Sequence, residues 1–145
     1  MPHEPTPVIG LLLRLLNQEW GNQVHVAMQK AGFDGIGAAN ANVIPFVPEE
    51  GIQVSELAQL ARVRKQSMAQ SVEQLEKQGY LERRPDPSDR RARLVFLTER
   101  GKAVRPVAVK AGREVERRWA KLTSKEDVEQ LRESLQTLLA KLRDQ

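Results

Sequence analysis

Two stretches of the sequence decide the fold: VSELAQLARVRKQSMAQSVEQLEKQGYLERR at residues 54–84 and DPSDRRARLVFLTERG at residues 86–101. In the first stretch apolar residues recur three or four positions apart, which is the spacing of amphipathic helices. They predict a short helix over Val54–Ala61, a tight turn at Val63, and a second helix over about Arg64–Gln78 that Gly79 ends. The inward positions of the second helix are Met68, Val72 and Leu75.

The hydrophobic period then changes to two, which is the period of a β-strand with one buried face. Tyr80–Arg84 and Ala92–Leu97 are the predicted strands, and the segment Pro85–Arg90 joins them. Two strands with a Pro/Asp/Ser/Arg tip between them predict a β-hairpin directly after the two helices.

Further helices are predicted on both sides of this unit. Residues 8–31 form a long amphipathic helix that Gly32–Gly37 ends, and a short apolar helix follows at about Ala38–Val47. Thr98 caps a long helix to about Leu122, in which Pro106 either causes a kink or marks the true first turn. The last helix has alternating spacings of three and four between Val128, Leu131, Leu135, Leu138 and Leu142.

Composition excludes several classes of function. The 145 residues are enough for one domain with a real core. The absence of cysteine excludes disulfides, thiolate metal sites and thiol redox sensing, and only His3 and His25 are present for a histidine-based centre. The longest apolar run, Val8–Leu16, is too short to span a bilayer, and the acidic Met1–Pro7 segment does not resemble a signal peptide. We therefore expect a cytoplasmic protein without a metal or cofactor.

The charge is concentrated in the middle of the chain. The formal net charge is +4, and residues 62–93 hold nine basic and five acidic residues, so this window carries the whole excess. Its basic residues are Arg62, Arg64, Lys65, Lys77, Arg83, Arg84, Arg90, Arg91 and Arg93. Basic residues on a helix and an adjoining hairpin indicate a surface that binds the phosphates of a nucleic acid.

The two quoted stretches resemble the winged helix–turn–helix of the multiple antibiotic resistance regulator (MarR) family. The most specific element is Asp89-Arg90-Arg91, followed by alternating apolar residues and then Leu97-Thr98-Glu99-Arg100-Gly101. The resemblance extends over essentially the whole chain. It implies a mainly α fold with a small β-wing, in which residues 37–98 bind DNA and residues 1–36 and 99–145 supply N- and C-terminal dimerisation helices.

The resemblance also assigns roles to residues. It implies that the helix over Arg64–Gln78 enters the major groove, that Arg91 enters the minor groove, and that Asp89 pairs with Arg91. A plain salt bridge at the hairpin tip is the alternative for that pair. Arg84 and Arg90 of the hairpin are further predicted DNA-binding residues.

The helix pattern suggests which residues contact bases and which contact phosphates. The face opposite the inward positions is centred on Gln66, Gln70, Glu73 and Lys77. The predicted contacts to base edges are Gln66, Ser67 and Gln70, in the N-terminal half of the helix. Arg64 and Lys65 suit phosphates, although either can reach a guanine. Ser55 begins the preceding helix, where it either binds a phosphate or only starts the helix.

Many members of the MarR family respond to small, often aromatic or phenolic, anions, and the resemblance implies a site for such an effector. The residues predicted to line an effector site are Trp20, His25 and Phe46. The alternative is that Trp20 and Trp119 belong only to the core of a dimer. Such an effector would release the protein from DNA by binding one conformation better than another.

Two other functions compete with DNA binding. Catalysis is disfavoured because no known catalytic motif is present, and Gly32, Gly35 and Gly37 lack the spacing and preceding strand of a dinucleotide-binding loop. A module that binds protein through its winged helix remains an alternative, but it has no need for clustered hairpin arginines. The sequence therefore predicts a homodimeric regulator, most simply a repressor, that binds an inverted-repeat operator in double-stranded DNA.

Overall fold

A computed structural model describes residues 5–36, 40 and 43–145 of the chain. Over these residues the elements in chain order are α1 (Ile9–Lys30), the 3-10 helix η1 (Ile44–Phe46), α2 (Val54–Ala61), α3 (Lys65–Lys77), β1 (Leu81–Asp86), β2 (Asp89–Leu97), α4 (Glu99–Leu122) and α5 (Lys125–Arg143). β1 and β2 form one two-stranded antiparallel sheet. The predicted fold class, mainly α with a small β-wing, is therefore confirmed.

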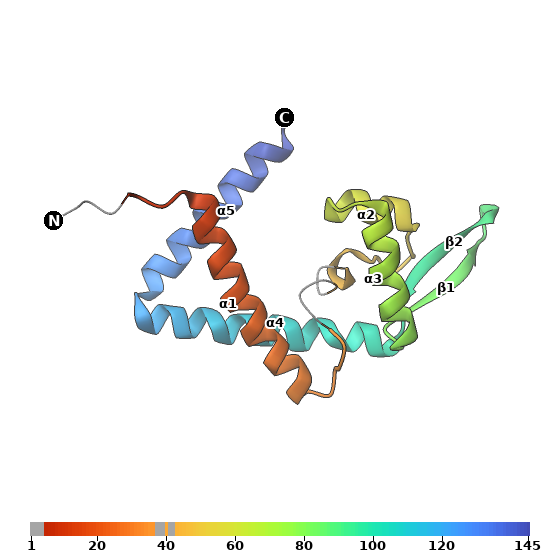
Figure 1. The fold of residues 1–145 in the computed structure, drawn as a ribbon, viewed down its shortest axis with the longest axis horizontal. Coiled ribbons are helices and arrows are strands. Elements are labelled where there is room, and N and C mark those ends of the chain that lie inside the picture. The colour runs from red at the N-terminus through yellow and green to blue at the C-terminus, as the bar shows by residue number, and fades with distance from the viewer. Residues whose placement is uncertain (1–4, 37–39, 41–42) are drawn as a thin grey trace.

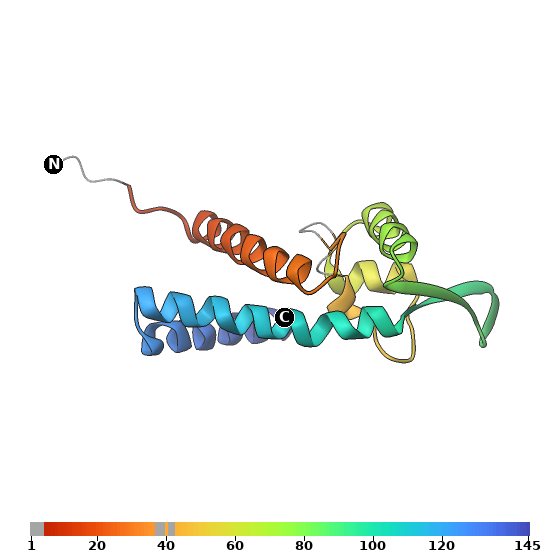
Figure 2. The same ribbon diagram turned by 90° about the horizontal axis from the view of Figure 1, so that it is seen from below.

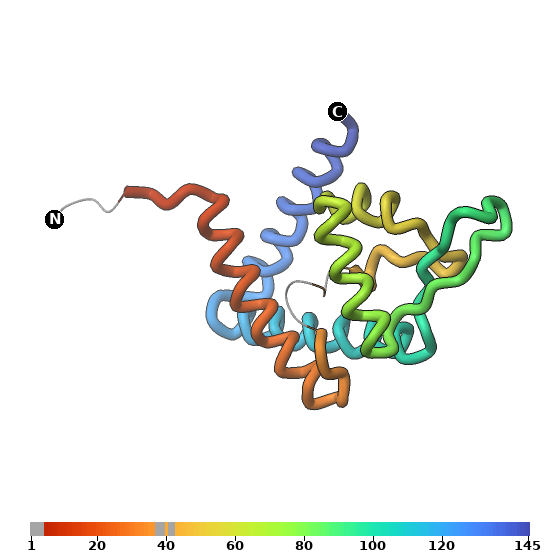
Figure 3. Tube along the Cα trace, turned by 45° about the vertical axis from the view of Figure 1, so that its right-hand side comes forward, coloured from red at the N-terminus to blue at the C-terminus, as the bar shows by residue number. Residues whose placement is uncertain are grey.

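The long helix α4 connects the two halves of the molecule (Figure 1). α1 packs across it and α5 folds back beside it, whereas α2, α3 and the hairpin lie around its N-terminal end. The hairpin projects away from the helices at that end, as Figures 2 and 3 show from other directions. Within the described residues, no helix combines the length and apolarity needed to cross a membrane.

The best-buried core lies under α3. The side chains of Leu57, Val72, Leu75 and Val95 have no measurable exposure, so α2, α3 and β2 meet there. Each such apolar side chain contributes about 1.5–3 kcal/mol when it is fully buried. The core includes Met68, Val72 and Leu75, the three positions predicted to face inward. This packing fixes which face of α3 remains exposed.

One predicted element differs from the structure, and the structure decides between the two alternatives for Pro106. The short helix predicted over Ala38–Val47 lies partly outside the described residues, and its described end is a single 3-10 turn at Ile44–Phe46. Pro45 in this turn has no N–H to donate, which disfavours an α-helix there. In addition, α4 begins at Glu99, so Pro106 lies inside the helix and does not mark its first turn.

The hairpin strands are longer than predicted. Pairing continues to Asp86 on one strand and begins at Asp89 on the other, with a register irregularity between Pro85 and Asp86. The predicted loop Pro85–Arg90 therefore shrinks to Pro87 and Ser88. The Asp86 side chain takes over the turn, because its carboxylate accepts hydrogen bonds from the backbone N–H and the hydroxyl of Ser88 at 2.9 and 2.7 Å.

Tyr80 joins the end of α3 to the start of α4. Its backbone N–H donates to Leu75 O, and its carbonyl accepts the Thr98 N–H at 3.1 Å. Its buried hydroxyl donates to Asp34 O at 2.6 Å, which adds the segment after α1 to the same junction. Thr98 caps α4 by accepting the Gly101 N–H and also donates its hydroxyl to Gly79 O.

Gly101 is required at this junction because of the space around it. A Cβ at this position would lie 2.1 Å from the backbone oxygen of Tyr80, far closer than atoms in van der Waals contact. The obstacle is backbone, which cannot rotate away as a side chain can. The glycine in the Leu97–Gly101 motif therefore allows α4 to approach the end of α3.

We expect Gly101→Ala to destabilise the protein even though alanine favours helices by about 1 kcal/mol over glycine. The clash forces α4 away from Tyr80, and overpacking of this kind costs about 1–3 kcal/mol or more. Chemical denaturation measures the free energy of unfolding. Ala103→Gly, at an exposed position in the same helix, calibrates the contribution of helix propensity. A Gly101→Ala protein as stable as the wild type would show that the junction tolerates displacement.

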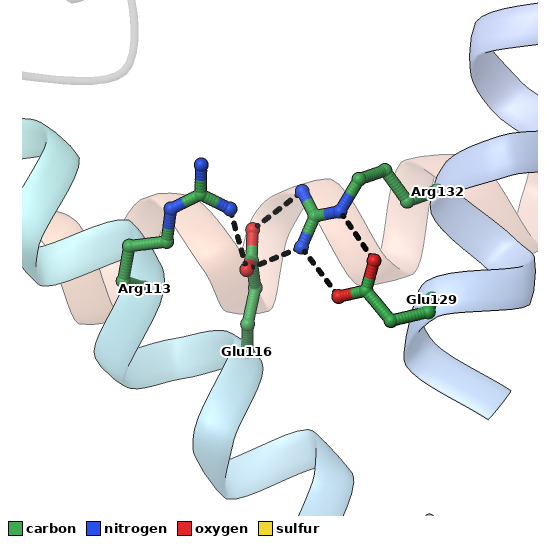
Figure 4. Close-up of polar contacts among 4 residues, drawn as sticks. All are labelled: Arg113, Glu116, Glu129 and Arg132. Carbon is green, nitrogen blue, oxygen red and sulfur yellow. Dashed lines mark hydrogen bonds and ion pairs between the residues drawn. The ribbon is translucent and has the colours of Figure 1, made fainter. Parts of the chain in front are cut away.

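An ion-pair network fixes α5 against α4 (Figure 4). The Glu116 carboxylate accepts hydrogen bonds from Arg132 on α5, at 3.1 and 2.5 Å, and from Arg113 on its own helix at 3.1 Å. Glu129 contacts the same Arg132 guanidinium from the other side. The Glu116 side chain is only 19% exposed, so water screens this interaction less than it screens a surface pair.

This network makes stability depend on pH. The hydrogen bonds from Arg132, and secondarily those from Arg113, hold the pKa of Glu116 below its ordinary value of 4.5 despite partial burial. A lowered pKa means that the folded state favours the charged carboxylate. Its stabilisation is thus complete above the unfolded pKa and is lost as the pH falls through the lower, folded pKa.

Glu116→Gln should therefore lower the melting temperature at pH 7, and its deficit should shrink as the pH falls below about 4.5. Thermal unfolding of both proteins between pH 7 and pH 3 measures this. Glu133→Gln, at an exposed position on α5, serves as the control and should follow the wild type at every pH. A deficit that stays constant across the range would contradict a role for the charge of Glu116.

Candidate nucleic-acid interface

The exposed face of α3 carries the predicted contacts to bases. Gln66, Ser67 and Gln70 are all exposed in the N-terminal half of the helix. They remain exposed because Met68, Val72 and Leu75 turn another face of the helix into the core. A helix whose polar face is free over its first two turns can enter the major groove of B-DNA and reach base edges there.

Two exposed cations lie at the start of the same helix. Arg64 is the N-cap residue of α3, with an extended backbone and no side-chain capping hydrogen bond, and Lys65 is the first helical residue. Their charges are placed beside the predicted base contacts. The structure therefore brings all five predicted residues of this helix and its cap onto one surface.

Ser55 differs from the predicted helix start. α2 begins at Val54 with Gln53 as its N-cap residue, so Ser55 occupies the second helical position and is half-buried. Its hydroxyl does not cap the helix, although its backbone N–H belongs to the first turn, where amides lack partners within the helix.

The hairpin contributes a second set of exposed cations. Arg90 and Arg91 both lie within β2 and are exposed. The expected pairing of the Asp89 and Arg91 side chains is wrong, because the Asp89 carboxylate instead accepts the backbone N–H of Arg91 at 3.0 Å. An aspartate commonly binds the N–H two residues ahead of it. Among the described residues, the Arg91 guanidinium consequently has no ion-pair partner.

The carboxylate at the turn is also held in its charged form. The Ser88 hydroxyl, and secondarily its backbone N–H, lower the pKa of Asp86 from the ordinary value for an aspartate. Asp86 thus stays ionised at neutral pH and keeps the two-residue turn closed. The turn positions the neighbouring arginines at the end of the hairpin.

Strand alternation separates the arginines of β1 onto two faces. Arg83 points toward α3, where its Nε lies 3.4 Å from Glu76 Oε2. Arg84 points to the opposite face, where it pairs with Glu82 and lies 4.4 Å from the ring centroid of Phe96. The structure therefore places Arg84 and Arg83 on opposite faces of the hairpin, because successive strand residues point to opposite sides of a sheet.

Arg93 is one of four basic residues of the charged window that are not among the predicted site residues. Arg93 is exposed and lies on β2 two positions after Arg91, where it is the register partner of Pro85. The signal that could have identified it is the period of two in the sequence, once β2 is known to extend as far as Asp89.

The three predicted effector residues do not form one site. Trp20 lines a cavity of about 350 Å³ between α1, η1, α4 and α5. Its ring also packs edge-on against the ring of Trp119, with 5.7 Å between the two ring centroids. Phe46 lines a different cavity of about 460 Å³ at the base of the hairpin. His25 lines neither cavity, since its Nδ1 donates a hydrogen bond to Ile36 O at 2.8 Å.

Comparison with known proteins agrees with this geometry. Residues 40–92 match the model of the MarR family. An HTH-type transcriptional regulator of Bacillus subtilis, YybA, itself uncharacterised, is 32% identical over 62 residues, which are 43% of this chain and 41% of YybA. The matched segment thus spans less than half of that relative.

Two solved structures match over nearly the whole chain. Wild-type MarR from E. coli in its apo form has a TM-score of 0.75 and 25% identity, covering 94% of this chain and 99% of that one. CouR from Rhodococcus jostii, bound to p-coumaroyl-CoA, has a TM-score of 0.67 and 26% identity over 90% of each chain. Both solved structures therefore share the helix–turn–helix, the hairpin and the flanking helices with this chain, and the segment that matches the MarR family model contains the helix–turn–helix.

Proposed function

We propose that this protein is a transcriptional regulator that binds double-stranded DNA, with α3 in the major groove and the hairpin over the adjacent minor groove. The observation that carries the proposal is the set of exposed cations at both ends of one surface. Arg64, Lys65 and Arg91 are exposed and form no ion pair among the described residues. Binding phosphates therefore requires no existing pair to break, while it releases counterions from the DNA.

The residues divide into two roles. Gln66, Ser67 and Gln70 contact base edges from the exposed half of α3, and a glutamine can pair with an adenine through two hydrogen bonds. Arg64 and Lys65 bind phosphates and fix the register of the helix in the groove. The Arg91 guanidinium suits a narrow A/T-rich minor groove, where the negative potential is enhanced.

We further propose that the protein acts as a homodimer through α1 and α5. The N-terminal half of α1 exposes apolar side chains on all sides, with Leu12, Leu15 and Leu16 between 41% and 50% exposed. A helix that is apolar all round is normally buried, and in one protomer nothing described covers these side chains. The leucines of α5, whose heptad spacing places them on one face, are likewise exposed.

The dimer explains the arrangement of the operator. Two α3 helices related by a two-fold axis contact two half-sites about one helical turn, roughly 10 bp, apart in an inverted repeat. In the simplest case such binding blocks transcription, so we propose a cytoplasmic repressor. A small aromatic or phenolic effector in the cavity beside Trp20 would release it, which agrees with the aromatic ligand held by CouR.

Leu138→Arg should convert the dimer to monomers at micromolar concentration. Leu138 is 55% exposed in the single chain, and an arginine there would be buried without a partner in the dimer, at a cost of several kcal/mol. Sedimentation velocity measures the change in mass. Gln136→Arg, an exposed position on the opposite side of α5, is the matched control and should stay dimeric. Monomeric wild-type protein would refute the dimer.

Arg91→Ala should weaken binding to the operator about tenfold or more, because each lost contact of this kind costs about 1–3 kcal/mol. Fluorescence anisotropy with a duplex from the upstream intergenic region, and with a scrambled duplex, measures affinity at several salt concentrations. Arg117→Ala removes the same charge from an exposed position on α4 and should bind like the wild type. If Arg91→Ala also binds like the wild type, the hairpin does not contact DNA. No selective binding by the folded wild type would favour a protein-binding role.

A further inference from the structure

Among the described residues, Arg62 is the one residue other than glycine that has a positive φ. Its φ of 55° and ψ of 44° lie in the left-handed region, and it occupies the C-cap position of α2. The Arg62 N–H donates to Gln59 O at 3.2 Å and the Val63 N–H donates to Ala58 O at 3.0 Å, which closes the end of the helix. Glycine is the usual residue at such a position, because a Cβ crowds the left-handed backbone. An arginine here is therefore less favourable for the fold than a glycine.

No contact within the chain compensates for this conformation. The Arg62 side chain is exposed and forms no hydrogen bond or ion pair with another described residue. A cation at the C-terminal end of a helix is favoured by the helix dipole, but α2 has only eight residues, and salt screens an exposed charge. A residue held in an unfavourable backbone conformation without an internal partner indicates a role for its side chain outside the fold.

The position of Arg62 relative to α3 identifies the partner. Only Val63 separates Arg62 from Arg64, which is the N-cap residue of α3. The Met68 N–H donates to Arg64 O at 2.9 Å, and the Met68 side chain is buried, so the first turn of α3 is fixed to the core. A cation in the connection before α3 lies beside the base-reading half of the helix and not on it. Phosphates at the edge of the groove are the anionic groups that suit this position.

We propose that Arg62 binds a DNA phosphate at the edge of the groove that α3 enters, and that the left-handed turn holds it there. The inference rests on the proposed function, which assigns phosphate binding to Arg64 and Lys65 and gives Arg62 no role. Two backbone hydrogen bonds fix the turn in the free protein, so only the side chain has to be ordered when DNA binds. A phosphate contact does not distinguish sequences, so Arg62 raises affinity for every duplex by the same factor.

The proposal predicts opposite effects of Arg62→Gly on stability and on DNA binding. Glycine adopts the left-handed conformation without a steric penalty, so the melting temperature of the full-length protein should rise by about 2–4 °C. Arg62→Gln removes the charge but retains a Cβ, so it should not produce this rise. If Arg62 served only the end of α2 through its charge, both substitutions would lower the melting temperature.

Fluorescence anisotropy with the operator duplex and the scrambled duplex measures the effect on DNA. Arg62→Gly and Arg62→Gln should each weaken binding to both duplexes by the same factor, about tenfold at low salt. The slope of log Kd against log salt concentration should fall by about one per chain, because one phosphate contact is lost. Arg117→Ala, which removes a charge from an exposed position on α4, should leave the affinity and the slope unchanged.

The outcomes separate this inference from the proposed function. Wild-type affinity of both Arg62 variants at every salt concentration would overturn the inference and leave DNA binding by α3 intact. A loss confined to the operator duplex would also overturn it, because Arg62 would then contact a base. An equal fall in slope for Arg117→Ala would assign the effect to net charge and not to a contact. Wild-type protein that binds no duplex would refute the proposed function, and this inference with it.

Discussion

The close contact between the backbone of Tyr80 and the first turn of α4 is the constraint on which the rest of the molecule depends. At this point α3 ends, β1 begins and α4 is capped, and the Tyr80 side chain adds the segment after α1 through its bond to Asp34 O. The contact is possible only because residue 101 is a glycine. A displacement of α4 is therefore transmitted to α3 and to the hairpin, since backbone atoms meet there without a flexible side chain between them.

The two ends of α4 have different chemistry. Near Tyr80 the helix is held by backbone hydrogen bonds and close packing, whereas at its far end Glu116 and Arg132 join it to α5 through charge. Both cavities lie along the same helix between these ends, and Arg105 borders both of them. The effector proposed for the cavity beside Trp20 would bias the angle between α4 and the elements it carries, and that angle would set the separation of the two α3 helices in the proposed dimer.

Much of the fold followed from the sequence because it depends on local patterns. The spacing of Met68, Val72 and Leu75 identified both the helix and its buried face, and thereby the exposed positions Gln66 and Gln70. The hairpin and the long capped helix were likewise recognisable. The errors arose at two places. Pro45 prevents an α-helix in the described end of the segment before α2, and the Asp86 carboxylate closes a two-residue turn, so that β1 continues two residues beyond its predicted end.

The sequence by itself therefore determined the order of the elements, the charge of the hairpin and the resemblance to MarR regulators, because hydrophobic period, capping and composition are properties of neighbouring residues. Only the tertiary structure decided that Asp89 binds a backbone N–H and leaves Arg91 unpaired, that Arg84 faces away from α3, and that Trp20, His25 and Phe46 lie in three different surroundings. The surroundings of the three predicted effector residues depend on contacts between segments far apart in the chain, which local spacing does not encode, and the Asp89 contact depends on the backbone conformation near the hairpin turn.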